Sequence, residues 1–228
     1  MNSQQNNLVI FGASNIVSDL FDAALACGLI PTKVVLNQPE VCGERDIPLA
    51  LRVQALACLC PPPRIQPLAE FEPADDELYV LGPTTPAREA LAVLLEMRFG
   101  LRFHTLVHPS AYISPLAKLS TGVFVGANSV IAPGVHLEPH VFINRGVTVG
   151  HDNQVGAFTR IQPGANLGGL SYIGRGVTIG LGATLIERLR IGDGAVIGGG
   201  AVVLKDVPER VLAVGVPAKV RKHLDSNE

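Results

Sequence analysis

The stretch VTVGHDNQVGAFTRIQPGA, residues 147–165, carries an aliphatic side chain at every sixth position. Counting from Val149 in both directions extends this series to sixteen consecutive Ile, Leu or Val residues. They are Ile113, Leu119, Val125, Ile131, Leu137, Ile143, Val149, Val155, Ile161, Leu167, Ile173, Ile179, Leu185, Ile191, Ile197 and Val203. Val107 adds one further step at the start. Chance does not produce sixteen matches in a row, so this period decides the fold of the second half of the chain.

A period of six fits neither an α-helix, which repeats at 3.6 residues, nor a single strand, which alternates at two. It is typical of a parallel β-helix in which three hexads, or 18 residues, make one coil. The aliphatic residue of each hexad points inward and stacks on its equivalent one coil away. Four positions later the side chain is usually small or Val, as at Ala165 and Val177, which suits a narrow interior. Glycine and asparagine let the backbone turn at the corners.

The first part of the chain alternates strands with helices. We predict strands at 7–11, 33–37 and 77–81 and helices at 18–27 and 86–99, with a surface loop at 61–77. This order is typical of βαβ units with a parallel sheet. The prediction is therefore an α/β Rossmann-like domain at 1–105, followed by an all-β parallel β-helix with a C-terminal tail at 106–228.

The composition excludes several classes of protein. The 228 residues carry a formal net charge of −2, which gives no reason to expect a nucleic-acid partner or an anionic membrane surface. No apolar run approaches the ~20 residues that span a bilayer, so membrane insertion is not expected. The four cysteines have no zinc-binding spacing, and Cys58 and Cys60 are expected to be small buried residues. We therefore expect a reduced, cytoplasmic protein without a metal.

His151 and Asp152 lie at one predicted corner of the β-helix. Residues 18 apart stack at one strand spacing, ~4.8 Å, which places Gly169 next to His151. An imidazole beside an unobstructed backbone N–H can act as base and oxyanion donor around one carbonyl. The alternative is that His151 is a solvated corner residue, and the spacing leaves both interpretations open. His136 and His140 are expected to lie at the surface.

Several motifs resemble those of the hexapeptide-repeat acyltransferases, namely INRGVTVGHD, PGANLGG, GGGAVVLKDVP and GVPAK. More narrowly, the chain resembles the bacterial nucleotide-sugar acetyltransferases of the sialic-acid and bacillosamine type. Weaker similarity at FGAS and VHPSAYIS extends the resemblance over essentially the whole chain. The resemblance implies a small Rossmann-like domain before a left-handed β-helix. It also implies a homotrimer with active sites between subunits, acetyl-CoA as co-substrate and no metal.

The resemblance also implies roles for individual residues. His151 is the expected general base, Asp152 supports it, and Asn144 matches an active-site asparagine. The backbone N–H of Gly169 is expected to meet the thioester carbonyl. The other expected cofactor-binding residues are Arg160, Leu181, Gly199, Pro217 and Lys219. The expected substrate-binding residues are Gly12, Ser14, Asn15, Asn37, Gln38 and Gly82.

Three departures from the family pattern affect these expectations. Arg160 stands where the family often has a second histidine, and an arginine cannot act as a base. In GASNIVS, Asn15, Ile16 and Val17 replace an open loop, and the β-branched pair of Ile16 and Val17 should crowd a phosphate at the helix N-terminus. Asn37 and Gln38 replace an acidic pair that meets uracil, and LGP replaces a Gly-Asn pair. We therefore expect an intact acetyl-transfer site and an altered sugar-nucleotide site.

The leading hypothesis is an acetyl-CoA-dependent acetyltransferase acting on an amino sugar, nucleotide-linked, for surface-polysaccharide or glycoconjugate synthesis. One alternative keeps the acyl transfer but uses a non-nucleotide amine or hydroxyl acceptor. A second is a zinc hydratase of the γ-carbonic-anhydrase type, which needs three histidines, whereas none occurs between His151 and His223. A third is a catalytically silent scaffold, which the retained His-Asp pair argues against.

Overall fold

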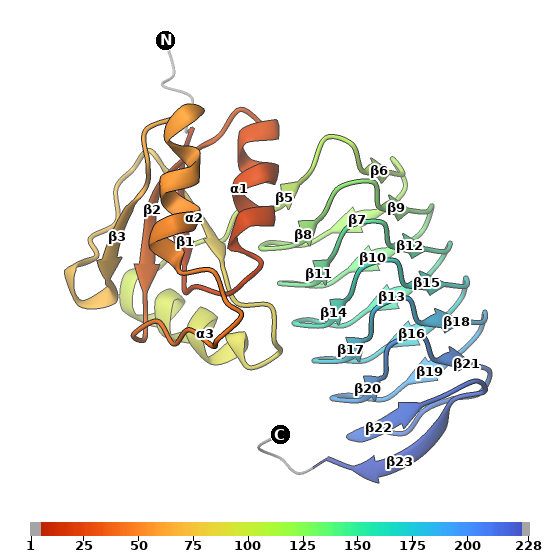
Figure 1. The fold of residues 1–228 in the computed structure, drawn as a ribbon. Coiled ribbons are helices and arrows are strands. Elements are labelled where there is room, and N and C mark those ends of the chain that lie inside the picture. The colour runs from red at the N-terminus through yellow and green to blue at the C-terminus, as the bar shows by residue number, and fades with distance from the viewer. Residues whose placement is uncertain (1–5, 225–228) are drawn as a thin grey trace. The chain divides into compact units, whose positions relative to one another are not determined.

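The computed structural model of the chain describes residues 6–224 (Figure 1). It divides into two compact units, Met1–Leu106 and Val107–Glu228. The first unit is a parallel sheet with helices, and the second is a stack of short strands in three sheets. The predicted fold class is confirmed: an α/β Rossmann-like part precedes a parallel β-helix.

The first unit is built on a four-stranded parallel sheet with the order β3-β2-β1-β4. Its elements are β1 (Asn7–Phe11), α1 (Val17–Ala26), β2 (Ile30–Leu36), α2 (Leu49–Ala55), η1 (Leu56–Cys58), β3 (Arg64–Pro67), η2 (Leu68–Glu70), β4 (Glu77–Leu81) and α3 (Arg88–Phe99). Strand β1 is central, and its residues Leu8, Val9 and Ile10 are fully buried, as in sheets covered on both faces. Helix α3 ends where Gly100 takes the left-handed conformation, with φ +64.

Two parts of this unit differ from the sequence prediction. The sequence predicts a loop at 61–77, whereas the structure contains η2 and β3, which pairs in parallel with β2 at the edge of the sheet. A four-residue edge strand beside prolines has too little periodicity to be recognised. Helix α2 is also absent from the prediction. Cys58 is exposed and Cys60 half-buried, contrary to the prediction, because they lie at the surface end of η1.

An aromatic cluster closes one side of this sheet. The rings of Phe11 and Phe71 pack edge to face with centroids 4.9 Å apart, and Tyr79 packs beside both. The Tyr79 hydroxyl donates a hydrogen bond to the Ala74 carbonyl at 3.1 Å. Burial, with a contribution from the Glu77 charge, raises the pKa of Tyr79 to about 12.

This raised pKa predicts a loss of stability in alkali. The folded-state value exceeds the ordinary value of 10.0, so the neutral phenol stabilises the fold fully below pH 10.0. That contribution is lost as the pH rises toward about 12. We expect the free energy of unfolding in urea to fall as the pH rises from 10.0 toward about 12, and to fall less in Tyr79→Phe, which has no phenol to ionise. An equal fall in both proteins would contradict this assignment.

The second unit is the β-helix, whose strands form three sheets (Figure 1). The eight-stranded sheet contains β5 (Leu106–Val107), β8 (Phe124–Val125), β11 (Phe142–Ile143), β14 (Arg160–Ile161), β17 (Thr178–Ile179), β20 (Val196–Ile197), β22 (Val211–Val214) and β23 (Lys219–His223). The six-stranded sheet contains β6 (Tyr112–Ile113), β9 (Val130–Ile131), β12 (Thr148–Val149), β15 (Asn166–Leu167), β18 (Thr184–Leu185) and β21 (Val202–Val203). The five-stranded sheet contains β7 (Lys118–Leu119), β10 (His136–Leu137), β13 (Gln154–Val155), β16 (Tyr172–Ile173) and β19 (Arg190–Ile191).

The hexad residues form the core of this unit. Each strand pairs in parallel with the strand one coil away, so that Val149 lies opposite Leu167. Every hexad residue from Val125 to Val203 is buried in one continuous cluster. Ile113 is only partly buried, because the first coil has a neighbouring coil on one side alone. The six-residue period therefore identified the inward-facing positions correctly.

The regular winding ends near the C-terminus. Val207 pairs with Ile191, and Leu212 with Val196, so the last turns are two residues shorter than a full coil. Strand β23 then returns antiparallel to β22. One surface prediction is wrong: the His140 ring is buried and stacks on Phe158 with centroids 4.8 Å apart.

Candidate active site

Two corners of the β-helix carry the residues that the sequence singles out. The histidine corner joins the six-stranded to the five-stranded sheet and comprises residues 132–134, 150–152, 168–170, 186–188 and 204–205. The asparagine corner joins the eight-stranded to the six-stranded sheet and comprises residues 126–128, 144–146, 162–164, 180–182 and 198–200. Successive segments of one corner lie on successive coils, 18 residues apart.

At the histidine corner, His151 and Asp152 are bonded to each other. The Nδ1 atom of His151 lies 2.9 Å from Oδ2 of Asp152, and both side chains are 56% exposed. Asp152 has φ +57, a left-handed conformation that aspartate tolerates well. A side chain at Gly134, one coil earlier, would collide with the Asp152 carboxylate. The glycine therefore leaves room for the acid that holds the imidazole.

The ring of His151 lies against Gly169 on the next coil. A Cβ atom at Gly169 would stand 2.7 Å from His151 Nε2 and 2.9 Å from its Cδ2 and Cε1 atoms. The neighbouring Leu170 N–H donates to the His151 carbonyl at 2.8 Å, which ties the two coils together. Among residues 6–224, the Gly169 N–H donates no hydrogen bond. An exposed imidazole and a buried backbone N–H that makes no hydrogen bond within residues 6–224 therefore lie together at this corner.

Asn153 holds the backbone of this corner in place, and it was not among the predicted site residues. Its side chain is fully buried, and its Nδ2 donates to the carbonyls of Gly150 at 2.7 Å and Gly168 at 2.8 Å. Its Oδ1 accepts the Ser171 N–H at 3.0 Å. These bonds join the two coils on either side of the His151 ring. The available signal was an asparagine directly after His-Asp, although asparagine is also common at solvated turns.

Asn144 lies at the asparagine corner, and its side chain hydrogen-bonds within that corner. It is buried, its Oδ1 accepts the Arg145 N–H at 2.8 Å, and its Nδ2 lies 3.4 Å from Gln162 Oε1. Its own carbonyl accepts the Ser129 hydroxyl at 2.8 Å. Both polar atoms of the Asn144 side chain therefore have partners within the chain, and their hydrogen bonds stabilise this corner.

Leu181 and Gly199 share the asparagine corner with Asn144. Leu181 is 62% exposed, and its carbonyl accepts the Gly200 N–H at 2.8 Å. In each coil one strand of the six-stranded sheet, β12 in the coil of Asn144 and His151, separates this corner from the histidine corner.

The remaining predicted cofactor residues lie elsewhere in the β-helix unit. The Nε atom of Arg160, on β14, donates to Thr178 Oγ1 at 3.0 Å, and burial lowers the pKa of this guanidinium. Arg160 therefore belongs to a sheet face and to neither corner. Pro217 lies between β22 and β23, and Lys219 is the exposed first residue of β23.

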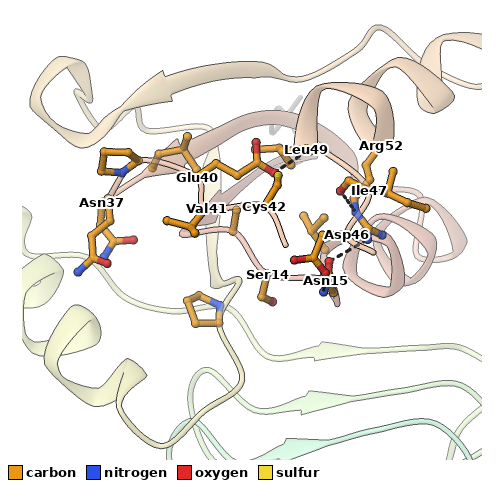
Figure 2. A pocket seen from close by; sticks show the side chains of 16 residues that line it. Ser14, Asn15, Asn37, Glu40, Val41, Cys42, Asp46, Ile47, Leu49 and Arg52 are labelled. Atoms are coloured by element: carbon orange, nitrogen blue, oxygen red, sulfur yellow. Dashed lines mark hydrogen bonds between the residues drawn. The ribbon is translucent and has the colours of Figure 1, made fainter. Parts of the chain in front are cut away.

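In the first unit, four of the six predicted substrate residues line one cavity of about 410 Å³. They are Ser14, Asn15, Asn37 and Gln38. Gly12 and Gly82 lie outside its lining and serve backbone packing, because a side chain at Gly82 would collide with the Gly12 carbonyl. Figure 2 shows Asn37 at one end of the cavity and Asn15 at the other.

The Asn15 end of this cavity contains a polar network that the sequence analysis missed (Figure 2). Asn15 Nδ2 donates to Asp46 Oδ1 at 2.7 Å, and its Oδ1 accepts from Arg52 at 3.0 Å. Hydrogen bonds from Asn15 and from the Gly43 N–H lower the pKa of Asp46. An ionised carboxylate therefore stands just before α1, which begins at Val17.

Solved structures resemble the whole chain, whereas no protein-family model and no curated protein matches its sequence. The acetyltransferase domain of PglB from Neisseria gonorrhoeae is 26% identical, with a TM-score of 0.79 and coverage of 95% of this chain and 100% of that one. A mutant of GDP-perosamine N-acetyltransferase from Caulobacter crescentus, in complex with CoA and GDP-perosamine, is 25% identical, with a TM-score of 0.78 and coverage of 95% and 97%. The chain is a hexapeptide-repeat acyltransferase.

The acyltransferase shares its fold with a third protein, WeeI from Acinetobacter baumannii. That structure is 22% identical, with a TM-score of 0.73 and coverage of 94% of this chain and 99% of that one. The suspected family is thus confirmed, and with it the left-handed form of the β-helix.

None of the helices in residues 6–224 is long and apolar enough to cross a membrane. Over that same described range, no three His, Cys, Asp or Glu side chains are grouped to hold a metal ion.

Proposed function

We propose that this acyltransferase moves the acetyl group of acetyl-CoA to the amine of a nucleotide-linked amino sugar, with His151 as general base. The observation that carries the proposal is the histidine corner. There an imidazole held by Asp152 lies against Gly169, whose N–H makes no hydrogen bond within residues 6–224. We assign acyl transfer to the β-helix unit and acceptor binding to the first unit.

The hydrogen bond to Asp152 decides which nitrogen of His151 is the base. A carboxylate can only accept hydrogen bonds, so the proton of the neutral ring resides on Nδ1. The lone pair on Nε2 is then free to take a proton from the acceptor amine as the amine attacks the thioester. A positioned base of this kind contributes roughly 10²–10⁴-fold to the rate.

The Gly169 N–H supplies the second element of the reaction. As the amine attacks, the thioester carbonyl oxygen gains negative charge, and a fixed backbone donor stabilises it. One such donor is worth roughly 10²–10³-fold. The thioester is already activated, so transfer needs no covalent enzyme intermediate. Acetyl-CoA is the co-substrate, and Pro217 and Lys219 are proposed to lie at its nucleotide end.

We propose that the working enzyme is a homotrimer. His151 and Gly169 lie at one corner, whereas the proposed pantetheine residues Leu181 and Gly199 lie at another. One thin cofactor can contact both sets if the histidine corner of one subunit faces the asparagine corner of the next. Light scattering of the purified protein should give three times the mass of the chain, and a monomer that turns over acetyl-CoA would contradict this arrangement.

The acceptor is proposed to bind in the cavity of the first unit. Its 410 Å³ suits a nucleoside-sized group, and the amides of Asn37 and Gln38 offer both donors and acceptors to a base edge. The four cysteines are free thiols, in keeping with the cytoplasm as the proposed compartment.

Release of CoA thiol from acetyl-CoA tests the proposal directly. We expect turnover with a UDP-, GDP- or dTDP-linked amino sugar and little with the same sugar after removal of the nucleotide. The acetylated amine is identified by mass spectrometry. Absence of turnover with every amino sugar, nucleotide-linked or free, would refute the proposed function.

A second candidate function, acetylation of an acceptor that carries no nucleotide, is favoured by Asp46. An ionised carboxylate just ahead of α1 repels a diphosphate at this helix N-terminus and offsets the attraction of Arg52, which donates to Ser18 at 2.8 Å. We therefore expect Asp46→Asn, which keeps the shape of the side chain, to bind UDP, GDP or dTDP more tightly than the wild type.

Calorimetric titration measures this difference, and Asp193→Asn, on the β-helix unit, is the control for a general change of charge. If the wild type already binds a nucleoside diphosphate as tightly as Asp46→Asn does, the second candidate is wrong and the nucleotide-linked acceptor stands.

A further inference from the structure

Leu170 adopts a backbone conformation that does not suit it. Its φ is +61, in the left-handed region, where a leucine side chain crowds the following carbonyl. The equivalent positions on the two preceding coils are Gly134 and Asp152, residue types that enter this region readily. Leu170 and Arg188, which has φ +63 one coil later, therefore both occupy a position that glycine or aspartate would fill with less strain.

Burial does not explain the choice of leucine. The side chain is 40% exposed and lies outside the continuous core of the β-helix. Two further apolar side chains on the following coils of the histidine corner are also exposed, Ile186 at 41% and Leu204 at 47%. All three lie at the histidine corner on the C-terminal side of His151, Ile186 and Leu204 at its first position and Leu170 at its third. Apolar side chains that gather at a surface mark a place where something else binds.

Leu170 lies directly beside the proposed reaction centre. It follows Gly169 in the chain, and its N–H donates to the His151 carbonyl at 2.8 Å. The leucine is thus one peptide unit from the proposed oxyanion donor and bonded to the backbone of the proposed base. Strained residues held in place by surrounding contacts are found at ligand-binding positions.

We propose that Leu170 is a specificity-determining residue that packs against the acyl group of the donor and limits its length. This rests on the proposed function, because it takes the thioester carbonyl to lie at the Gly169 N–H. An acetyl group then fits beside the leucine side chain, whereas a four-carbon acyl group collides with it.

The test compares acetyl-CoA with butyryl-CoA in Leu170→Gly. Removal of the side chain should raise kcat/KM for butyryl-CoA relative to acetyl-CoA by roughly tenfold or more, the size expected for a few methylene contacts. The melting temperature should stay level or rise, because glycine accepts the left-handed conformation. A purely structural role for Leu170 would change both donors equally and leave the ratio unaltered.

Arg188→Gly is the matched control. Arg188 occupies the equivalent position one coil later with φ +63, so its replacement relieves the same backbone strain without touching the proposed acyl contact. We expect a similar effect on melting temperature and no change in the ratio of the two donors.

Three results would overturn the inference. The first is an unchanged donor ratio in Leu170→Gly, and the second is an equal change in Arg188→Gly. The third is a lower melting temperature with loss of the trimer, which would make Leu170 a subunit contact. If the wild type turns over neither donor with any amino sugar, the proposed function fails as well, which separates that case from failure of this inference alone.

Discussion

Replacement of His151 by alanine is expected to lower kcat for acetyl transfer by roughly 10²–10⁴-fold, the contribution of a positioned general base. The KM for acetyl-CoA should change little, because the imidazole acts on the acceptor proton rather than on the cofactor. The His151 side chain is 56% exposed, so its removal should leave the fold intact. Thiol release under saturating substrates measures kcat, and thermal unfolding confirms the fold.

His136→Ala provides the matched control for this variant. His136 lies on β10 in the same β-helix, and it belongs to neither of the two corners. We expect its kcat to equal that of the wild type. If His151→Ala retains kcat within about threefold of the wild type, far less than a base contributes, His151 is a solvated corner residue.

Replacement of Gly169 by alanine is expected to lower kcat by roughly 10²-fold, the scale associated with a misplacement of about 1 Å. The added Cβ would stand 2.7 Å from His151 Nε2 and within 2.9 Å of two ring carbons, so the ring must move. Because the ring is half-exposed, it can move outward without unfolding the β-helix. The displaced imidazole loses its alignment with Asp152 and with the acceptor.

A double mutant separates this effect from damage to the fold. In a His151→Ala background there is no ring for the new methyl group to displace, so Gly169→Ala should then cost little further activity. If the two losses instead multiply, the methyl group acts on something other than His151, and the proposed pairing of base and backbone donor is wrong. Equal melting temperatures of the single variants would confirm that the losses in kcat do not come from damage to the fold.

The β-helix could be predicted from the sequence because its pattern is local and repeated. Each coil buries the same positions, so the core residues recur with a fixed period from Val125 to Val203. The pattern failed where the winding ends, since Val207 and Leu212 pair at a shorter spacing. His140 was also misjudged, because its burial depends on stacking with Phe158 one coil away rather than on an inward hexad position.

The first unit was less predictable for a related reason. Strand β1 is central and β4 lies beside it, and both are rich in apolar residues and end just before a glycine, so their composition marks them. Strand β3 lies at the edge of the sheet and joins it only through pairing with β2. An edge strand is stabilised by that partner more than by its own side chains, so its local sequence resembles a loop.

By itself, the sequence determined the winding of the second unit and the contact between His151 and Gly169. Both follow from one periodic rule, since residues 18 apart must stack once the coil is known. Only the tertiary structure decided that the Asn144 amide is buried and bonded to the Arg145 N–H, and that Asp46 meets Asn15 ahead of α1. The latter contact joins residues 31 apart across a loop. No period relates such residues, and their meeting depends on how the whole first unit packs.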